Sequence, residues 1–210
     1  MMNNNDSAVS PVVGVMLMLV VTIIIAAVVS GFAGGFAEGQ TKTPQATIQG
    51  EFSVTSGLKI IHAGGEAIPT EDLVITVTNG PTFGSNLEAI TRNTLNLATV
   101  TNSNGLSLLY YNSGTGNTDG YNIKSFNPGD TFYVNITNCD PKILQPTMAV
   151  FGSAYEFDGT HWNYIGPAMK NNMWTMDFVN PDNIGKSFYL DVSDKSSGTL
   201  ISRAVVTIKG

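Results

Sequence analysis

The sequence offers few residues that could do chemistry. Its 210 residues include two histidines, His62 and His161, and one cysteine, Cys139. A metal site or a nucleophile–histidine pair needs several such side chains to converge, and neither an H-E-x-x-H nor a G-x-S-x-G pattern occurs. A single cysteine also excludes an intramolecular disulfide and a multi-cysteine zinc site. We therefore predict no catalytic residue, no metal and no cofactor, and a protein that is not an enzyme.

One acidic segment carries oxygen side chains that could bind calcium. Residues 177–183 contain Asp177, Asn180, Asp182 and Asn183. The order and the glycine of an EF-hand loop are missing from this segment. We interpret it as a solvated loop.

Aromatic side chains gather between residues 155 and 174. Beside hydrogen-bonding neighbours, such rings can form a surface on which sugars stack, but more often they fill a core. We favour the core for this set, which consists of Tyr155, Phe157, Trp162, Tyr164 and Trp174.

Asn135-Ile136-Thr137 is an N-glycosylation sequon. Around it, apolar residues alternate with polar ones, with Phe132, Val134 and Ile136 on one face of a predicted strand. Asn135 should then face solvent. It is a candidate for glycosylation if the protein is exported.

The chain is acidic and poor in charge. It has 10 Lys and Arg against 16 Asp and Glu, a formal net charge of -6, and 12% charged residues, about half of the ~25% typical of soluble domains. Nucleic acid is excluded as a partner, because phosphate contacts need clustered Lys and Arg. Disorder is excluded too, since it needs high charge and few apolar residues.

Part of the missing charge is explained by residues 7–37, which contain no charged side chain. Ser10 suits an N-cap and Pro11 the first helical position. At ~1.5 Å per residue, a helix over 11–36 would be roughly 39 Å long, enough to cross a ~30 Å hydrocarbon core. A signal peptide cut after Ala33 or Ala37 is the alternative. We favour a retained helix, because the apolar run is about twice the ~7–15 residues of a signal core and no Lys or Arg precedes it.

Small residues recur every four positions in the second half of this segment. One row is Ala26, Ser30 and Gly34, and the other is Ala27, Gly31 and Gly35. This spacing allows helices to approach closely. Small and β-branched residues are common in membrane spans in any case, so the spacing alone leaves both interpretations open.

After residue 45 the pattern changes to short β-branched and aromatic runs bounded by Gly, Asn, Asp or Pro. We predict an antiparallel β-sandwich, Ig-like in the broad sense, over 46–210, preceded by a linker at 38–45. Residues 86–96 are ambiguous. The predicted strands are 47–54, 58–62, 73–78, 106–111, 131–137, 147–151, 162–165, 188–192 and 200–208.

The string Asp6-Ser7-Ala8-Val9-Ser10-Pro11-Val12-Val13-Gly14-Val15, followed by the long apolar run, is similar to the N-terminus of archaeal type IV pilins. Weaker similarities continue at residues 62–73, 126–131 and 197–201. The fold class that the resemblance implies is α+β in the pilin sense, a long hydrophobic helix followed by an all-β head.

The resemblance also implies a processed subunit. A prepilin peptidase would cut between Ser7 and Ala8, which removes leader 1–7 and leaves helix 8–37 as membrane anchor and filament core. Two departures are that the leader has no basic residue and that Val12 stands where bacterial type IV pilins carry glutamate. The residues implied in helix packing are Pro11, Gly14, Ala26, Ala27, Ser30, Gly31, Gly34 and Gly35.

The implied function is structural. Copies of the chain would enter the cytoplasmic membrane as precursors and be assembled by the pilus machinery into an extracellular adhesive filament. An archaellin-like motility filament and a monomeric, membrane-tethered binding module stay open as alternatives. A secreted enzyme is disfavoured, because no catalytic constellation is found.

Overall fold

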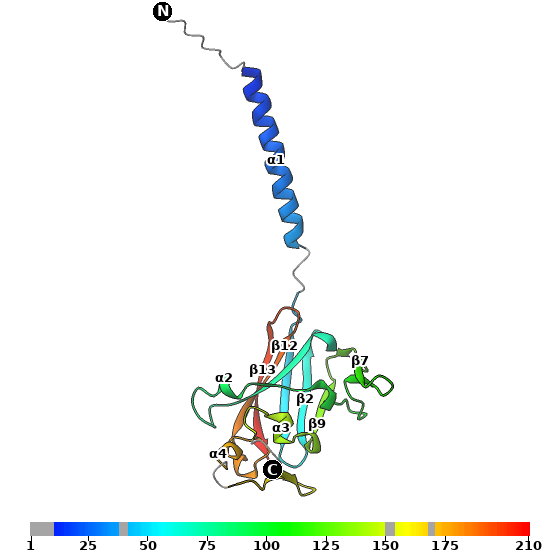
Figure 1. Ribbon diagram of the computed structural model, residues 1–210, viewed down its shortest axis with the longest axis vertical. Coiled ribbons are helices and arrows are strands. Elements are labelled where there is room, and N and C mark those ends of the chain that lie inside the picture. Colours follow the sequence, from blue (N-terminus) through cyan, green and yellow to red (C-terminus); the bar gives the residue numbers. More distant parts are fainter. Residues whose placement is uncertain (1–10, 38–41, 150–153, 168–170) are drawn as a thin grey trace, which may run out of the picture. The chain divides into compact units, whose positions relative to one another are not determined.

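The computed structural model describes residues 11–37, 42–149, 154–167 and 171–210 (Figure 1). The chain divides into two compact units, Met1–Lys42 and Thr43–Gly210. Helix α1 (Pro11–Ala37) belongs to the first unit, and the second is a β-rich head. The strands of the head are β1 (Ala46–Ser53), β2 (Gly57–Gly65), β3 (Ile68–Pro69), β4 (Leu73–Asn79), β5 (Asn93–Thr94), β6 (Leu109–Asn112), β7 (Asn117–Tyr121), β8 (Ser125–Phe126), β9 (Thr131–Asn135), β10 (Tyr155–Phe157), β11 (Trp162–Tyr164), β12 (Ser187–Asp194) and β13 (Leu200–Lys209). Its short helices are α2 (Glu88–Thr91), α3 (Pro141–Leu144) and α4 (Asn171–Trp174), with 3-10 turns η1 (Thr70–Asp72), η2 (Leu97–Thr99), η3 (Ile136–Asn138) and η5 (Pro181–Asn183).

Within the described residues, seven strands form one curled sheet in the order β5-β4-β12-β13-β1-β2-β9. All neighbours are antiparallel except β1 and β13, which are parallel and pair only at Phe52 with Ile208 and at Ser53 with Lys209. The first and last strands of the head are thus neighbours in the interior of the sheet. Three two-stranded sheets, β3–β8, β6–β7 and β10–β11, complete the described β-structure.

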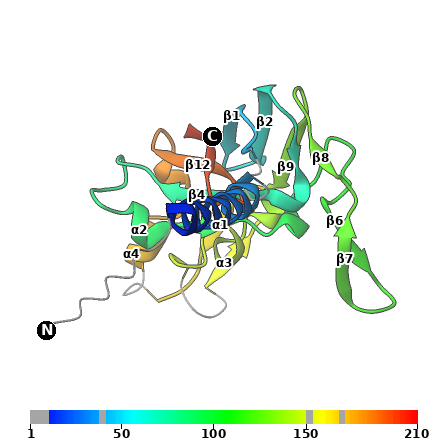
Figure 2. The ribbon, with the colours of Figure 1, turned by 90° about the horizontal axis from the view of Figure 1, so that it is seen from above.

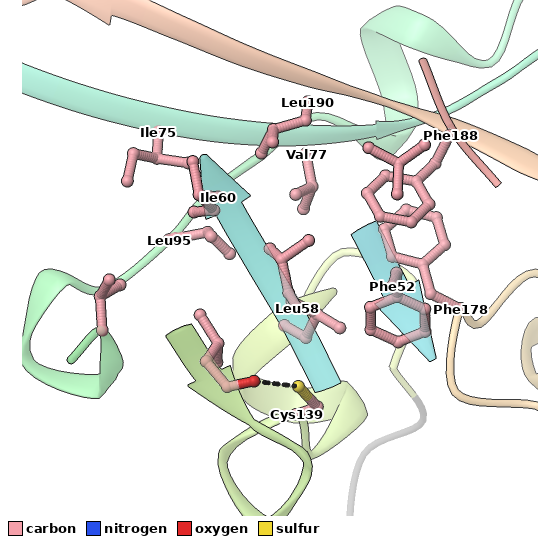
Figure 3. Close-up of a cluster of buried hydrophobic side chains, with 14 of the residues drawn as sticks. Phe52, Leu58, Ile60, Ile75, Val77, Leu95, Cys139, Phe178, Phe188 and Leu190 are labelled. Atoms are coloured by element: carbon pink, nitrogen blue, oxygen red, sulfur yellow. Dashed lines mark hydrogen bonds between the residues drawn. The ribbon is translucent and has the colours of Figure 1, made fainter. Parts of the chain in front are cut away.

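The inward side chains of the sheet form one hydrophobic core (Figure 3). Phe178 stacks on Phe188 with ring centroids 4.1 Å apart, and Phe52 meets Phe188 edge-on at 5.6 Å. Each of these rings is fully buried or nearly so. Burying an aromatic side chain removes about 150–250 Å² from water, so this cluster is a main source of the stability of the head.

Buried amides join the segments that cover the core. Gln145 donates to the Asn79 side chain (3.0 Å) and accepts from the backbone N–H of Phe178 (2.6 Å). Asn79 also donates to the carbonyl of Met176 (2.8 Å). Because buried polar groups are costly when unpaired, this network fixes how the loop after α4 joins the end of β4.

On the opposite face of the sheet, Arg203 of β13 holds α2 in place. Its guanidinium donates two hydrogen bonds to Asp191 of β12, at 2.7 and 2.8 Å, and a third to Glu88 of α2 at 3.3 Å. It also lies 4.7 Å from the ring centroid of Tyr189. The ambiguous segment 86–96 therefore contains α2 and β5. The bidentate ion pair of Arg203 with Asp191 lies within the sheet, and α2 is linked to it by the single contact of Glu88.

The prediction of a long apolar helix followed by an antiparallel β-rich head is confirmed. The layers are arranged differently from an Ig-like pair of sheets. A single sheet curls around its core, and short helices, turns and small hairpins cover the concave side. The parallel pairing of β1 with β13 is the feature that the sequence did not predict.

Three predicted strands are absent or shorter than expected by two or more residues. The strand expected at 131–137 ends at Asn135, because Ile136–Asn138 forms the 3-10 turn η3. The strand expected at 106–111 begins only at Leu109. The strand at 147–151 is wrong in its described part, because residues 146–149 form a turn in which the Gln145 carbonyl accepts from the N–H groups of Met148 and Ala149. Pro146, which has no N–H for a strand ladder, begins this turn. Residues 150–151 lie outside the described residues.

Candidate functional site

Helix α1 begins at Pro11, as predicted, and continues to Ala37. Residues 15–30 contain neither Gly nor Pro, but many are β-branched and have modest helix propensity in water. An apolar solvent changes this balance, because every backbone N–H and C=O must then be bonded within the segment. The sequence therefore favours a helix most strongly in lipid or inside an apolar assembly.

The described side chains of α1 are exposed on every face. Each large hydrophobic side chain from Val12 to Phe32 is at least 45% exposed. The single hydroxyl between residues 11 and 29, that of Thr22, donates to the carbonyl of Leu19 at 2.8 Å, so its polarity is satisfied within the helix. A helix that is apolar all round is typical of an apolar environment, such as lipid or an assembly of helices.

By length and composition α1 can cross a membrane. The candidate span is Pro11–Phe32, which contains 22 residues and is not buried inside the molecule. At ~1.5 Å per residue it is roughly 33 Å long, against a hydrocarbon core of ~30 Å.

Nothing within α1 requires a glycine at position 14 or 31. A Cβ added at Gly14 or Gly31 would have no neighbour within 4 Å outside the local backbone. Glycine in a helix interior costs about 1 kcal/mol relative to alanine, so its presence calls for another reason. Close approach of a second helix is such a reason.

The other residues that were predicted to pack between helices also lie in α1. Ala26, Ala27 and Ser30 lie in the exposed part of α1, and Gly34 and Gly35 lie in its last turns. The predicted cleavage residues Ser7 and Ala8 and the predicted N-cap Ser10 lie outside the described residues. That the two rows of small residues pack against neighbouring helices remains a prediction.

His62 and Cys139, which the sequence analysis considered as possible reactive residues, are both buried beside backbone carbonyl groups. His62 is buried, its Nε2 lies 3.0 Å from the Glu66 carbonyl oxygen, and its ring meets Phe126 edge-on at 5.1 Å. Cys139 is buried with its Sγ 3.6 Å from the Val134 carbonyl (Figure 3). Burial raises the pKa of the Cys139 thiol to about 12, which leaves almost no thiolate at neutral pH.

The aromatic set is part of the core, as favoured. Tyr155, Trp162 and Trp174 are buried, while Phe157 and Tyr164 are partly buried against the core. The Trp162 indole donates to the Ile136 carbonyl at 2.7 Å. These rings contact each other, so they do not form an open surface for stacking a sugar.

Asn135 is exposed at the end of β9, as predicted. Its Oδ1 accepts from the backbone N–H of Thr137 at 3.0 Å and from the Thr137 hydroxyl at 2.9 Å. Its Nδ2, the atom that glycosylation would modify, makes no hydrogen bond within the described part of the chain.

The interpretation of 177–183 as a solvated loop is wrong. Asp177, Phe178 and Asn183 are buried, and the Asn183 side chain donates to the Asp177 carbonyl at 2.7 Å. Phe178 and Val179 enter the core and draw their polar neighbours inward. Burial raises the pKa of the Asp177 carboxyl to about 8, against the opposing effect of the Tyr155 hydroxyl and with a further contribution from Asp140. Acidic composition suggested exposure here, and the two apolar residues were the available signal of burial.

Residues 7–48 match a family model described as archaeal type IV pilin, N-terminal. The match spans α1 and the first residues of β1, 42 of 210 residues, and it confirms the resemblance inferred from the string around Pro11. No curated protein matches the chain.

Proposed function

We propose that the protein is a structural subunit of an archaeal type IV pilus, used for adhesion, with no catalytic activity. The observation that carries the proposal is α1, an uncharged helix exposed on every face, in the segment that matches the pilin N-terminal model. Copies of α1 would form the apolar core of the filament, and the heads would form its surface.

The proposed sequence of events follows from where α1 is stable. The precursor enters the cytoplasmic membrane through α1, and a prepilin peptidase removes residues 1–7. The assembly machinery then transfers α1 from lipid to the filament core, where the other helices supply the apolar surroundings. Head-to-tail contacts that do not close on themselves give an open polymer, which ends up outside the cell.

Asn135 has a place in this proposal as a glycosylation site of the exported head. Its exposure and the free Nδ2 support the assignment. Mass spectrometry of a tryptic digest would detect the added sugar, and an unmodified peptide at full occupancy would contradict it.

Mass spectrometry of the mature N-terminus, combined with electron microscopy of sheared surface material, tests the main proposal. A chain that starts at Ala8 and is present in filaments is the expected result. An intact Met1 without filaments would indicate a simple membrane tether. A start near Glu38 would mean that α1 is a cleaved signal, and would overturn the proposal.

A further inference from the structure

A polar groove of about 390 Å³ lies along the outer edge of β9. Three segments line it. They are a turn at residues 102–104, the side chains of Ile123, Ser125 and Asn127 in and around β8, and the stretch 129–133 that leads into β9. The turn and the 123–127 stretch are joined through the β6–β7 hairpin, which projects from the rest of the head (Figures 1 and 2).

The walls of the groove are held by hydrogen bonds. Thr101 and Tyr133 exchange two backbone bonds of 2.8 Å, which attach the turn to β9. Asn102 Oδ1 accepts from the N–H groups of Asn104 and Leu106, both at 3.0 Å. Asp130 Oδ2 accepts from the backbone and side-chain N–H groups of Asn127, at 2.8 and 3.1 Å. A ligand would therefore meet a preorganised surface, which lowers the entropic cost of binding.

The groups that line the groove are neutral hydrogen-bonding groups with one carboxylate. The lining includes the amides of Asn102, Asn104 and Asn127 and the carboxyl of Asp130, but no Lys, Arg or His among the described residues. The Asn104 side chain and the Tyr133 hydroxyl make no hydrogen bond within the described part of the chain, so both are available to a ligand. Ile123 and Tyr133 add an apolar portion.

We infer that this groove binds a neutral saccharide. Each sugar hydroxyl both donates and accepts a hydrogen bond, which matches amides, and the C–H face of a sugar packs against apolar and aromatic groups. Phosphate or sulfate groups would meet no cation and would lie near the Asp130 carboxylate, so anionic ligands are disfavoured. Saccharide binding by the head does not depend on the proposed function. Only its biological role does, because the sugar would belong to the surface to which the filament adheres.

Many weak sites on one polymer would suit adhesion. A shallow polar groove gives modest affinity at a single head, but repetition along a filament raises the overall affinity without any new contact. The sequence analysis did not bring turn 102–104 together with the Asn127–Asp130 turn, because their meeting depends on the pairing of Thr101 with Tyr133.

The test uses the full-length chain in detergent micelles, where it need not polymerise. The probes are immobilised neutral di- to tetrasaccharides of hexoses and N-acetylhexosamines, together with their sulfated counterparts. We expect retention on neutral probes and no retention on sulfated ones. Asn104→Ala and Tyr133→Ala should each weaken binding up to about tenfold, the effect of one lost hydrogen bond or packing contact.

Asn117→Ala is the matched control, because Asn117 of β7 is also exposed, makes no side-chain hydrogen bond within the described residues and lies outside the groove. Asn104→Ala removes no bond of the fold, so it keeps the test decisive if Tyr133→Ala destabilises the head. The inference is overturned if no neutral probe is retained or if sulfated probes bind equally well. It is also overturned if Asn104→Ala binds neutral probes like the wild type, or if Asn117→Ala weakens binding as much as Asn104→Ala does. None of these outcomes depends on filament formation, which electron microscopy reports separately.

Discussion

In α1, a Cβ added at Gly31 would touch nothing, whereas in the head a Cβ added at Gly50 would lie 2.5 Å from Cγ2 of Val206. At Gly57 it would lie 2.1 Å from the carbonyl oxygen of Val134, and φ there is +93°. The glycines of the head are thus explained by the chain itself. Gly31 has no such neighbour within α1. We propose that close approach of a second helix explains it, so the two units would obey different constraints.

The largest effect should come from enlarging the small residues of α1. Gly31→Leu combined with Gly34→Leu should abolish filaments while the head keeps its fold, because bulky side chains prevent close helix approach. Filament yield is measured by electron microscopy and pelleting, and the fold of the head by thermal unfolding. Val28→Leu, another enlargement of an apolar residue in α1, serves as the control. A normal filament yield from the double variant would remove the distinction between the two units.

Within the head, Gly57→Ala should destabilise by about 2–5 kcal/mol. Alanine at positive φ costs about 1–2 kcal/mol, and a further 1–3 kcal/mol comes from the contact with the backbone of β9. Gly185→Ala is the matched control, because φ is +91° there but a Cβ has open space. Denaturant unfolding of both variants separates the two terms. Equal losses would show that crowding at β9 contributes nothing.

Asp177 should make the stability of the head depend on pH. Its pKa rises from an ordinary 3.8 to about 8 on folding. Between these pH values the folded head holds up to one proton more than the unfolded chain. The free energy of unfolding therefore falls as pH rises, by at most about 1.4 kcal/mol per pH unit. The decrease ends when the folded carboxyl itself ionises near pH 8. The slope should be absent in Asp177→Asn and present in Asp182→Asn, an exposed position in the same segment.

Denaturant unfolding between pH 4 and 9 measures this slope. Because residues 11–37 contain no titratable side chain, packing of α1 should show no such dependence. Filaments that dissociate with the same pH profile as the head would contradict the separation of the two units.

The smallest effect is expected at Asp158, in the exposed turn between β10 and β11. The N–H groups of His161 and Thr160 and the side chain of Asn163 lower the pKa of this carboxyl to about 2. The contribution to stability is present above pH 3.8 and is lost as pH falls toward 2. An NMR titration of the Asp158 carboxyl checks the value, and a midpoint near 4 would show that the turn does not hold it.

How much the sequence predicted differs between the two units. Helix α1 was predicted from purely local signals, the Pro11 start and the uncharged run. The strand that carries Asn135 was predicted from its alternation, and so was the exposure of that side chain. These features depend on residues a few positions apart.

What the sequence did not predict depends on distant residues. The pairing of β1 with β13 joins positions 52 and 208, and no local pattern encodes such a contact. The burial of Asp177 follows from the entry of Phe178 and Val179 into the core, beside the distant side chain of Gln145 that accepts from the Phe178 N–H. The groove follows from Thr101 meeting Tyr133. Short-range composition predicted a solvated loop at residues 177–183, and for β1 and β13 it predicted two strands without their pairing.

The position of β1 has a mechanical consequence. In the chain, β1 is the first strand after α1. Tension applied through α1 would reach the head at Thr43 and Gln45, which bond to Ser197 and Glu66, and then at the start of β1. That strand is paired with β2 over its whole length, from Ala46 to Ser53, and with β13 at its far end. A load parallel to β1 would have to shear this ladder as a unit rather than unzip it one pair at a time. The first strand of the head is an interior strand of its sheet, an arrangement that would suit the proposed adhesive filament subunit under tension.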